Sequence, residues 1–489
     1  MSGNSTLGRR VRRGFVAVAT LMISTGVVYA QEKPTAKEEA LQEVVITGSR
    51  IARPDLDRLQ PTSVVNSQTF DQRGYTDVGQ ALQELPSFGI QPSSAANTQS
   101  TFGIAQSFVD LYSLGSQRTL TLVNGRRFVS SNTASLFGAT SPGQQVDLNV
   151  IPTKLIDRVE TVSVGGAPIY GADAIAGTVN IITKKDFEGL DVDIQAGVSN
   201  HKDAWNYRAR ALGGLNFADG RGNVTGVAEF TKSDGLVGTS RKNFASDLGF
   251  LAPITPGPFK TVLTPNEAVS SINTSGIPLV DDGGLLPGFG LPSQIFGISN
   301  NSGQILAWQP GSSALQPYNM GTETGNPVFW NGGDGIRLSQ FSNLLSPQER
   351  INLDGLGNFK ITDHVQAFAE AWFSEAHATN LIAQPAYNTL LFGNANTTSG
   401  NFVVSVNNPF LTPADRQTIQ NALNAYQAFF SGPNDPFGGP LDPNWNNQHF
   451  YVTRANTDLQ SGRAVGDQVV TRGVAGLNGD FSFGERNYT

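Results

Sequence analysis

The chain of 489 residues contains no cysteine. This absence excludes a disulfide-bonded scaffold, a thiol nucleophile and any Cys-ligated zinc or iron–sulfur site. Charged residues make up only 15% of the chain, and the four histidines include no two at metal-ligand spacing. The formal net charge of −7 argues against a nucleic-acid-binding protein, because such a protein needs a basic face. We therefore expect no metal, no other cofactor and no nucleic-acid partner.

Long apolar runs are scarce as well, and the most continuous one lies close to the start of the chain. It extends from Phe15 to Val28, follows four arginines between residues 9 and 13, and ends in Val28-Tyr29-Ala30. A basic stretch, an apolar run and small residues at the cleavage site predict a cleavable signal peptide over residues 1–30. The run is shorter than the roughly 20 residues that a membrane-spanning helix needs.

Two regions of different composition follow the signal peptide. Residues 31–52 are polar and charged, apart from the compact segment Glu43-Val44-Val45-Ile46-Thr47, which reads as a short extended strand. Residues 53–186 alternate between helical and strand patterns. We expect a helix from Thr76 to Leu85, because its apolar residues share one face and Pro86 ends it.

Three strands are predicted in the same α/β part. Asn124-Gly125 between two apolar runs is the strongest short hairpin signal and predicts a type I′ turn. Val159–Val164 and Thr178–Thr183 are β-branched runs of strand length.

From residue 187 onward the apolar residues recur with a period of two. Six segments show this alternation: Leu190–Val198, Trp205–Phe217, Val224–Lys232, Ile351–Ile361, Val365–Phe373 and Val469–Phe483. The alternation is weakest in Val224–Lys232, because Val227 falls on the polar face. Such strands suit either the exterior of a soluble antiparallel sheet or a membrane barrel with lipid on its apolar side.

The connections between these strands favour the membrane barrel. Short turns fall at one end of the strands, whereas the other end carries long stretches over about residues 234–349 and 377–467. Short periplasmic turns and long external loops are typical of outer-membrane barrels. Aromatic residues near the strand ends fit interfacial girdles: Trp205, Tyr207, Phe217, Phe359, Phe373 and Phe483.

Several motifs resemble those of TonB-dependent outer-membrane receptors. The most specific are Leu114–Leu120, Leu122–Arg127, Ile156–Glu160 and Tyr170–Ile182, which resemble the strand and turn segments of the family's plug domain. The plug-signature residues are Arg118, Asn124, Gly125, Arg126, Arg158, Glu160, Tyr170, Gly171, Gly177 and Asn180. We interpret them as structural. The glycines would serve tight turns and close backbone approach, and Arg158 and Glu160 would form plug–barrel ion pairs.

The resemblance implies a fold, a function and a set of partners. The fold would be an α+β plug domain over residues 53–186, followed over residues 187–489 by antiparallel transmembrane β-barrel strands. Glu43, Val44, Val45, Ile46 and Thr47 would form the TonB box, which pairs with a sheet edge of the energy-coupling protein TonB. The other partners would be outer-membrane lipid, the barrel-assembly machinery and a glycan or siderophore-like solute. The protein would reach the bacterial outer membrane by the general secretory route, although Arg12-Arg13 also hints at a twin-arginine signal.

The number of strands is small for such a receptor. We count six strands and the start of a seventh at Tyr488-Thr489, about 7 of the roughly 22 that a plug-bearing barrel uses. The sequence therefore predicts an N-terminal fragment of a longer protein. Loop aromatics such as Trp308, Tyr318 and Trp330 could stack on sugars or fold onto the barrel rim.

The function that the resemblance implies is the import of a scarce or large solute across the outer membrane with energy delivered by TonB. Two other functions compete with it. A plug-bearing protein could bind or signal at the outer membrane without transport. Only a short segment separates the signal peptide from the TonB box, which disfavours an added signalling domain. An exported hydrolase is disfavoured because no nucleophile elbow or His-Glu zinc motif occurs. We therefore expect a transporter and no enzyme.

Overall fold

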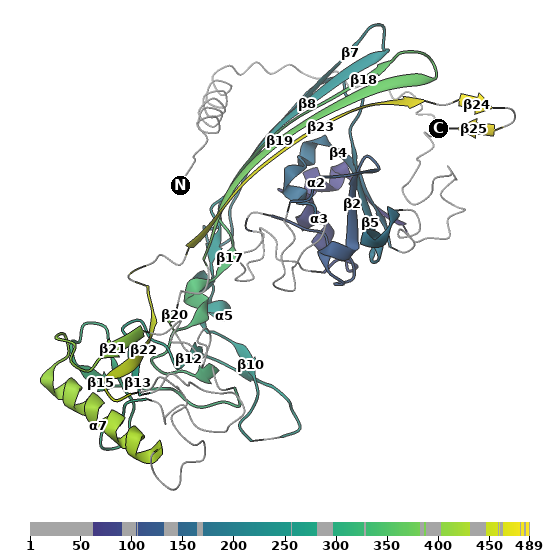
Figure 1. Ribbon diagram of the computed structural model, residues 1–489. Coiled ribbons are helices and arrows are strands. Elements are labelled where there is room, and N and C mark those ends of the chain that lie inside the picture. Colours follow the sequence, from purple (N-terminus) through teal and green to yellow (C-terminus); the bar gives the residue numbers. More distant parts are fainter. Residues whose placement is uncertain are drawn as a thin grey trace, which may run out of the picture.

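The computed structural model describes residues 62–89, 104, 106–131, 145–163, 170–255, 257–280, 297–326, 329–381, 386–387, 402–430, 446–457, 459, 463–479, 481–483 and 486–488. The chain forms three parts: an α/β unit, a sheet of long strands, and a region of short elements built from the connections between those strands (Figure 1). The expected signal peptide and the expected TonB box at residues 43–47 lie outside the described residues.

The α/β unit is built on a five-stranded sheet with the order β1-β4-β5-β2-β3. Its elements are β1 (Thr62–Asn66), α2 (Ser67–Arg73), α3 (Val78–Gln83), β2 (Thr119–Val123), β3 (Arg126–Arg127), β4 (Ile156–Val162) and β5 (Gly177–Thr183). Strands β2 and β5 are parallel, and the other pairs are antiparallel. Short 3-10 helices cover Ser116–Arg118, Leu148–Val150, Thr153–Leu155 and Ala172–Ala174.

The local predictions for this unit are largely confirmed. Helix α3 lies within the expected range, and the Asp77 side chain caps it by accepting a hydrogen bond from the Gln80 amide at 3.0 Å. Asn124 and Gly125 have φ values of 51° and 74°, as a type I′ turn requires. Helix α2 was not predicted.

The long strands form a second, six-stranded antiparallel sheet with the order β23-β19-β18-β8-β7-β6. Its strands are β6 (Gly189–Gly197), β7 (Asn206–Phe217), β8 (Gly222–Ser233), β18 (Gln348–Lys360), β19 (Val365–Leu381) and β23 (Arg463–Gly479). The sheet curves, and the α/β unit lies beside its concave face (Figure 1). The curvature leaves one face to the α/β unit and the other face free of it.

Side-chain burial confirms the period of two. Leu190, Ile194 and Val469 on the outer face are 75%, 70% and 59% exposed, whereas Arg208 and Arg210 on the inner face are buried. The structure explains why the apolar Val227 stands on the polar face of its strand. Val227 joins Leu212, Leu356 and Trp372 in the hydrophobic core of the α/β unit. An apolar residue on the polar face is therefore a docking contact.

The predicted last strand is interrupted. Strand β23 ends at Gly479, and β24 (Phe481–Phe483) pairs instead with β25 (Arg486–Tyr488). Tyr488 therefore belongs to a separate two-stranded sheet rather than to a seventh long strand. Thr489 lies outside the described residues.

The long connections contain structure of their own. They contribute β9 (Leu236–Val237), α5 (Lys242–Ala245), β10 (Gly249–Leu251), β11 (Val262–Thr264), β12 (Glu267–Val269), β13 (Ile277–Leu279), β14 (Leu306–Trp308), β15 (Leu315–Pro317), β16 (Phe329–Asn331), β17 (Asn343–Leu345), β20 (Ala386–Tyr387), β21 (Phe402–Ser405), α7 (Pro413–Phe430) and β22 (His449–Ala455). The two long connections meet, because β13 of the first pairs with β22 of the second. Together they form a folded region beyond one end of the long strands (Figure 1).

Helix α7 and a small core stabilise this region. Ile419 and Leu423 of the helix pack with Ile298 and Phe450. The loop aromatics Tyr318 and Trp330 are buried, and the Tyr318 hydroxyl donates to the Ser270 carbonyl oxygen at 2.9 Å. For these two residues the structure favours the interpretation that they fold inward. Among the described residues, no helix is long and apolar enough to cross a membrane.

Candidate functional site

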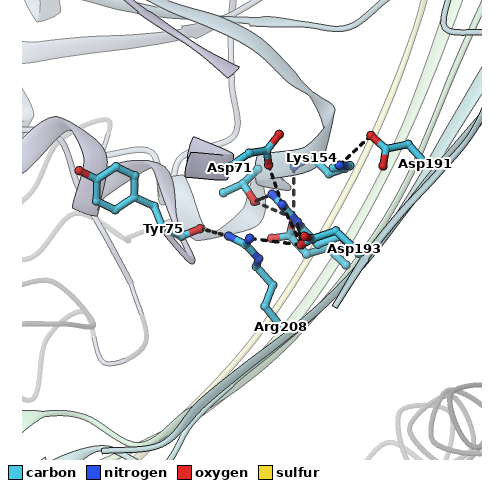
Figure 2. A network of polar contacts seen from close by, with 9 residues as sticks. Asp71, Tyr75, Lys154, Asp191, Asp193 and Arg208 are labelled. Atoms are coloured by element: carbon cyan, nitrogen blue, oxygen red, sulfur yellow. Dashed lines mark hydrogen bonds and ion pairs between the residues drawn. The ribbon is translucent and has the colours of Figure 1, made fainter. Parts of the chain in front are cut away.

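The inner face of the long strands holds the α/β unit through buried charges. Two arginines on β7 carry the first contact (Figure 2). Arg210 pairs with Asp71 of α2 at 2.6 Å, and its Nη1 donates to Thr153 Oγ1 at 3.1 Å. Arg208 donates to the backbone carbonyl oxygen of Tyr75. Both guanidinium groups also bond Asp193 Oδ1 on the neighbouring strand β6.

Reciprocal contacts surround this pair of arginines. Lys154 of the α/β unit pairs with Asp191 of β6 at 2.7 Å. Glu229 of β8 accepts hydrogen bonds from Thr153 Oγ1 at 3.0 Å and from the Lys154 amide at 3.3 Å. Each part of the molecule therefore contributes both charge signs. That arrangement satisfies buried charges, which would otherwise cost several kcal/mol each on the order-of-magnitude scale.

Strand β18 provides a second set of donors. Arg350 Nη2 donates to the Thr76 carbonyl oxygen at 2.8 Å, and Asn352 Nδ2 donates to the Asn149 carbonyl oxygen at 3.1 Å. Arginines from two strands thus bond the carbonyls of consecutive residues, Tyr75 and Thr76. The turn between α2 and α3 is therefore fixed to the wall of strands.

Two carboxylates of the α/β unit lie near Arg350. Burial is the largest influence on Asp147 and raises its pKa to about 7, although hydrogen bonds from the Ser107 and Asn149 amides and the charge of Arg350 oppose the shift. Burial likewise raises the pKa of Asp77 above its ordinary value, against the charge of Arg350. Near neutral pH the charge at this contact therefore depends on proton binding.

Glu370 of β19 organises a contact on another part of the sheet. Its carboxylate pairs with Arg126 of β3 and with Arg472 of β23, the latter at 3.0 Å, and accepts from Trp372 Nε1 at 3.3 Å. The Arg472 guanidinium lies 4.8 Å from the ring centre of Phe128. This ring meets Trp372 edge to face with 5.4 Å between ring centres. A plug-signature arginine thus joins a strand carboxylate within an aromatic enclosure.

The Asn124-Gly125 turn presents Arg126 to Glu370. Asn124 Oδ1 accepts from the Thr183 amide at 3.0 Å, and its Nδ2 reaches Glu370 Oε1 at 3.4 Å. Asn180 Oδ1 accepts from the Gly125 amide at 2.9 Å. Asn124, Gly125, Arg126 and Asn180 are therefore brought together, and two of them contact β19.

The other predicted signature residues make contacts inside the α/β unit. The expected plug–barrel ion pairs of Arg158 and Glu160 stay a prediction, and the ion pairs found for Arg158 lie within the α/β unit. Arg158 pairs with Glu160 at 2.8 Å and with Asp157 at 2.7 Å. Arg158 and Glu160 are two positions apart on one strand, so their side chains share a face and reach each other first.

Four further signature residues support local turns. Arg118 donates to the Leu114 carbonyl oxygen at 2.6 Å, and the Tyr170 carbonyl oxygen accepts from Arg127 at 2.8 Å. Gly171 has φ 94°. Gly177 has φ 148°, and a Cβ atom there would lie 2.4 Å from the Val162 carbonyl oxygen. The expectation of close backbone approach is confirmed at Gly177.

Sequence reasoning missed the strand residues of the interface. Arg208, Arg210, Glu370 and Arg472 stand at polar positions of alternating strands, so the pattern places them on the inner face. It contains no signal for their partners. Arg210 and Asp71 are 139 residues apart, and Arg126 and Glu370 are 244 apart.

Comparison with known families identifies the unit that these contacts hold. Residues 54–178 match the family model of the TonB-dependent receptor plug domain. The α/β unit is therefore similar to the plug domain of TonB-dependent receptors. The interface described above is therefore the contact between a plug and antiparallel strands.

Individual relatives cover part of their own length. The chain is 28% identical over 205 residues to the vitamin B12 transporter BtuB of Vibrio vulnificus, which covers 41% of this chain and 30% of that protein. The ferric enterobactin receptor PfeA of Pseudomonas aeruginosa is similar in structure with a TM-score of 0.39 and 14% identity, over 66% of this chain and 34% of that chain. For the siderophore receptor PirA of Acinetobacter baumannii the TM-score is 0.35 at 14% identity, over 65% and 40%. The chain spans about a third of the length of the curated relative.

Proposed function

We propose that this chain is the plug-bearing part of a TonB-dependent outer-membrane transporter, which imports a scarce or large solute with energy delivered by TonB. One observation carries the proposal. The plug is bound to the polar face of a sheet whose opposite face exposes apolar side chains such as Leu190 and Ile194. Lipid on the apolar face and a plug on the polar face are what a plugged membrane barrel requires.

The plug topology suits a pull from the N-terminal side. Strand β1 is the first described element and an edge strand of the plug sheet, paired with β4 alone. The expected TonB box at residues 43–47 precedes it by fewer than twenty residues. Force applied there would reach β1 before the arginine-bound turn at residues 75 and 76, so the edge strand would bear the load first.

The expected targeting and partners complete the proposal. Residues 1–30 would direct export and be cleaved, and the barrel-assembly machinery would insert the strands into the outer membrane. The solute would be a glycan or a siderophore-like molecule. The second candidate function is binding or signalling at the outer membrane without transport, in which the same plug contacts would persist but would never be released.

Binding of TonB is the direct test. Purified periplasmic domain of TonB is titrated onto the 489-residue chain in detergent, and binding is measured by calorimetry. Val45→Pro removes a backbone donor that strand addition needs. Ala36→Pro makes the same kind of change in the polar segment before the box and serves as the matched control.

We expect the unmodified chain and Ala36→Pro to bind equally, and Val45→Pro to lose at least tenfold in affinity. Equal binding by Val45→Pro would remove the TonB-box assignment. No binding by the unmodified chain would contradict TonB dependence itself.

A further inference from the structure

The plug contacts β8 and β18 in two chemically different ways along their length. Cross-strand register places Arg350 opposite Thr231, Asn352 opposite Glu229, and Asp354 opposite Val227. The inward side chains from Gln348 to Asp354 are polar, a distance of about 20 Å at strand rise. Level with Asp354 the contact becomes apolar, because Val227 opposite it enters the plug core together with Leu212 and Leu356.

The polar half contains an unusual concentration of unsatisfied groups. Among the described residues, several buried polar atoms on both sides of this contact have no hydrogen-bond partner. On the strands these are Thr231 Oγ1, Glu229 Oε1, Arg350 Nε, Arg350 Nη1 and Asp354 Oδ2, and on the plug Asp147 Oδ2 faces the same region. Buried polar groups in native proteins are bonded to protein or to ordered water.

A pocket adjoins these groups at the end of the strands that carries the long connections. It has a volume of about 130 Å³, and its lining includes Thr76, Gln80, Thr231, Lys232, Ser233 and Gln348. Thr76 accepts the hydrogen bond of Arg350, and Gln80 donates to Asp77, so the pocket and the unsatisfied groups share residues. The lining is polar and has room for several water molecules.

The remaining plug contacts differ from this face. Arg210 and Glu370 have their charges matched by named partners, as described above. Beside them, Arg208 Nε and Arg126 Nε are the arginine atoms without a partner among the described residues, so fewer unsatisfied groups gather there than on β8 and β18. The face formed by β8 and β18 therefore combines incomplete polar pairing with an adjoining pocket. Farther from the long connections, the apolar contact of Val227, Leu356 and Leu212 would exclude water.

We propose that water fills the outer half of the plug contact with β8 and β18, which is the half from the long connections as far as Asp354. We propose that the apolar contact around Val227 seals this water-filled half. We further propose that this is the face along which the plug parts from the strands to let the solute pass. This second statement rests on the proposed transport function. Partly hydrated polar surfaces separate more readily than a dry core, because water already satisfies their hydrogen bonds.

The absence of cysteine allows a direct test by single-cysteine labelling. Thr231→Cys and Val227→Cys lie on the same strand and the same face, and both side chains are buried, with 4% and 5% exposed. Leu212→Cys is a second position in the apolar contact. The 489-residue chain in detergent is treated with the charged reagent 2-(trimethylammonium)ethyl methanethiosulfonate, and modification is followed by mass spectrometry.

We expect Thr231→Cys to react at least tenfold faster than Val227→Cys and Leu212→Cys. Slow reaction at all three positions would overturn the water-filled half. Fast reaction at all three would overturn the seal. Val227→Cys and Leu212→Cys should react at similar rates, because local unfolding caused by one substitution would speed the reaction at that position alone.

The second statement is tested in energised cells that express the chain and TonB and grow in rich medium. Labelling of Val227→Cys should rise at least fivefold over de-energised cells, and Val45→Pro should abolish the rise. An unchanged rate at Val227→Cys, with TonB binding intact by calorimetry, would overturn the parting face and leave the proposed transport function standing.

Discussion

Replacing Asp147 by Asn should remove a pH-dependent loss of plug stability. Asp147 is fully buried, and its Oδ1 accepts hydrogen bonds from the Ser107 amide at 2.8 Å and from the Asn149 amide at 3.0 Å. An Asn side chain has the same shape and can keep both bonds through its own Oδ1. The substitution therefore removes the ionisable group with little change in packing.

The magnitude follows from the raised pKa. Burial moves the pKa of Asp147 from 3.8 to about 7. Since the folded state binds the proton more tightly than the unfolded state, the stabilisation is fully present below about pH 4 and is lost as the pH rises through 7. At about 1.4 kcal/mol per pKa unit, the total loss is on the order of 4 kcal/mol. It accumulates between about pH 4 and pH 7 and is complete near pH 8.

Urea unfolding of the chain in detergent, read by pulse proteolysis of the plug, measures this loss between pH 5 and 8.5. The free energy of unfolding of Asp147→Asn minus that of the unmodified chain should increase by about 2–3 kcal/mol over this range. Asp147→Asn should also lower the free energy of unfolding by about 1–3 kcal/mol at every pH. The reason is that the new amide nitrogen replaces Asp147 Oδ2, which has no partner among the described residues.

Asp173→Asn is the control, since its side chain is 34% exposed and pairs with Arg127 at the plug surface. Its difference from the unmodified chain should stay constant across the same pH range. If the Asp147→Asn difference were also constant to within about 0.5 kcal/mol, Asp147 would not titrate there and the reasoning from burial would be refuted.

Two further substitutions, each with its own control, test the contacts of the plug. Gly177→Ala should destabilise the plug by about 3 kcal/mol or more, because its Cβ would clash with the Val162 carbonyl oxygen and with Leu111. Gly125→Ala, with φ 74° and open space around the new atom, should cost only about 1–2 kcal/mol in the same urea assay. Similar losses for the two would contradict the steric argument. Glu370→Gln should weaken plug docking by about 3–5 kcal/mol, because it leaves Arg126 and Arg472 without a carboxylate. Limited proteolysis should then release the plug more readily than in Glu188→Gln, whose carboxylate bonds Asn216 at the surface; equal release would show that Glu370 does not anchor the plug.

Features with a local cause were predictable from the sequence. Asn124-Gly125 determines its turn because both residues adopt positive φ at low cost. The alternation in Leu190–Val198 determines which side chains share a face, because successive residues of a strand point to opposite sides. The same rule assigns Arg208, Arg210 and Glu370 to the polar face of their strands, although it does not single them out as interface residues.

Only the tertiary structure decided what those faces meet. Val227 weakened its strand's pattern because it packs into the plug core, which no periodicity records. Arg158 pairs with Glu160 on its own strand, and Arg210 pairs with Asp71 of a helix 139 residues away. Helix α7 is stabilised by Ile298 and Phe450 from distant segments. A side chain's direction is fixed by its own backbone, whereas its partner depends on which surfaces the folded chain brings together.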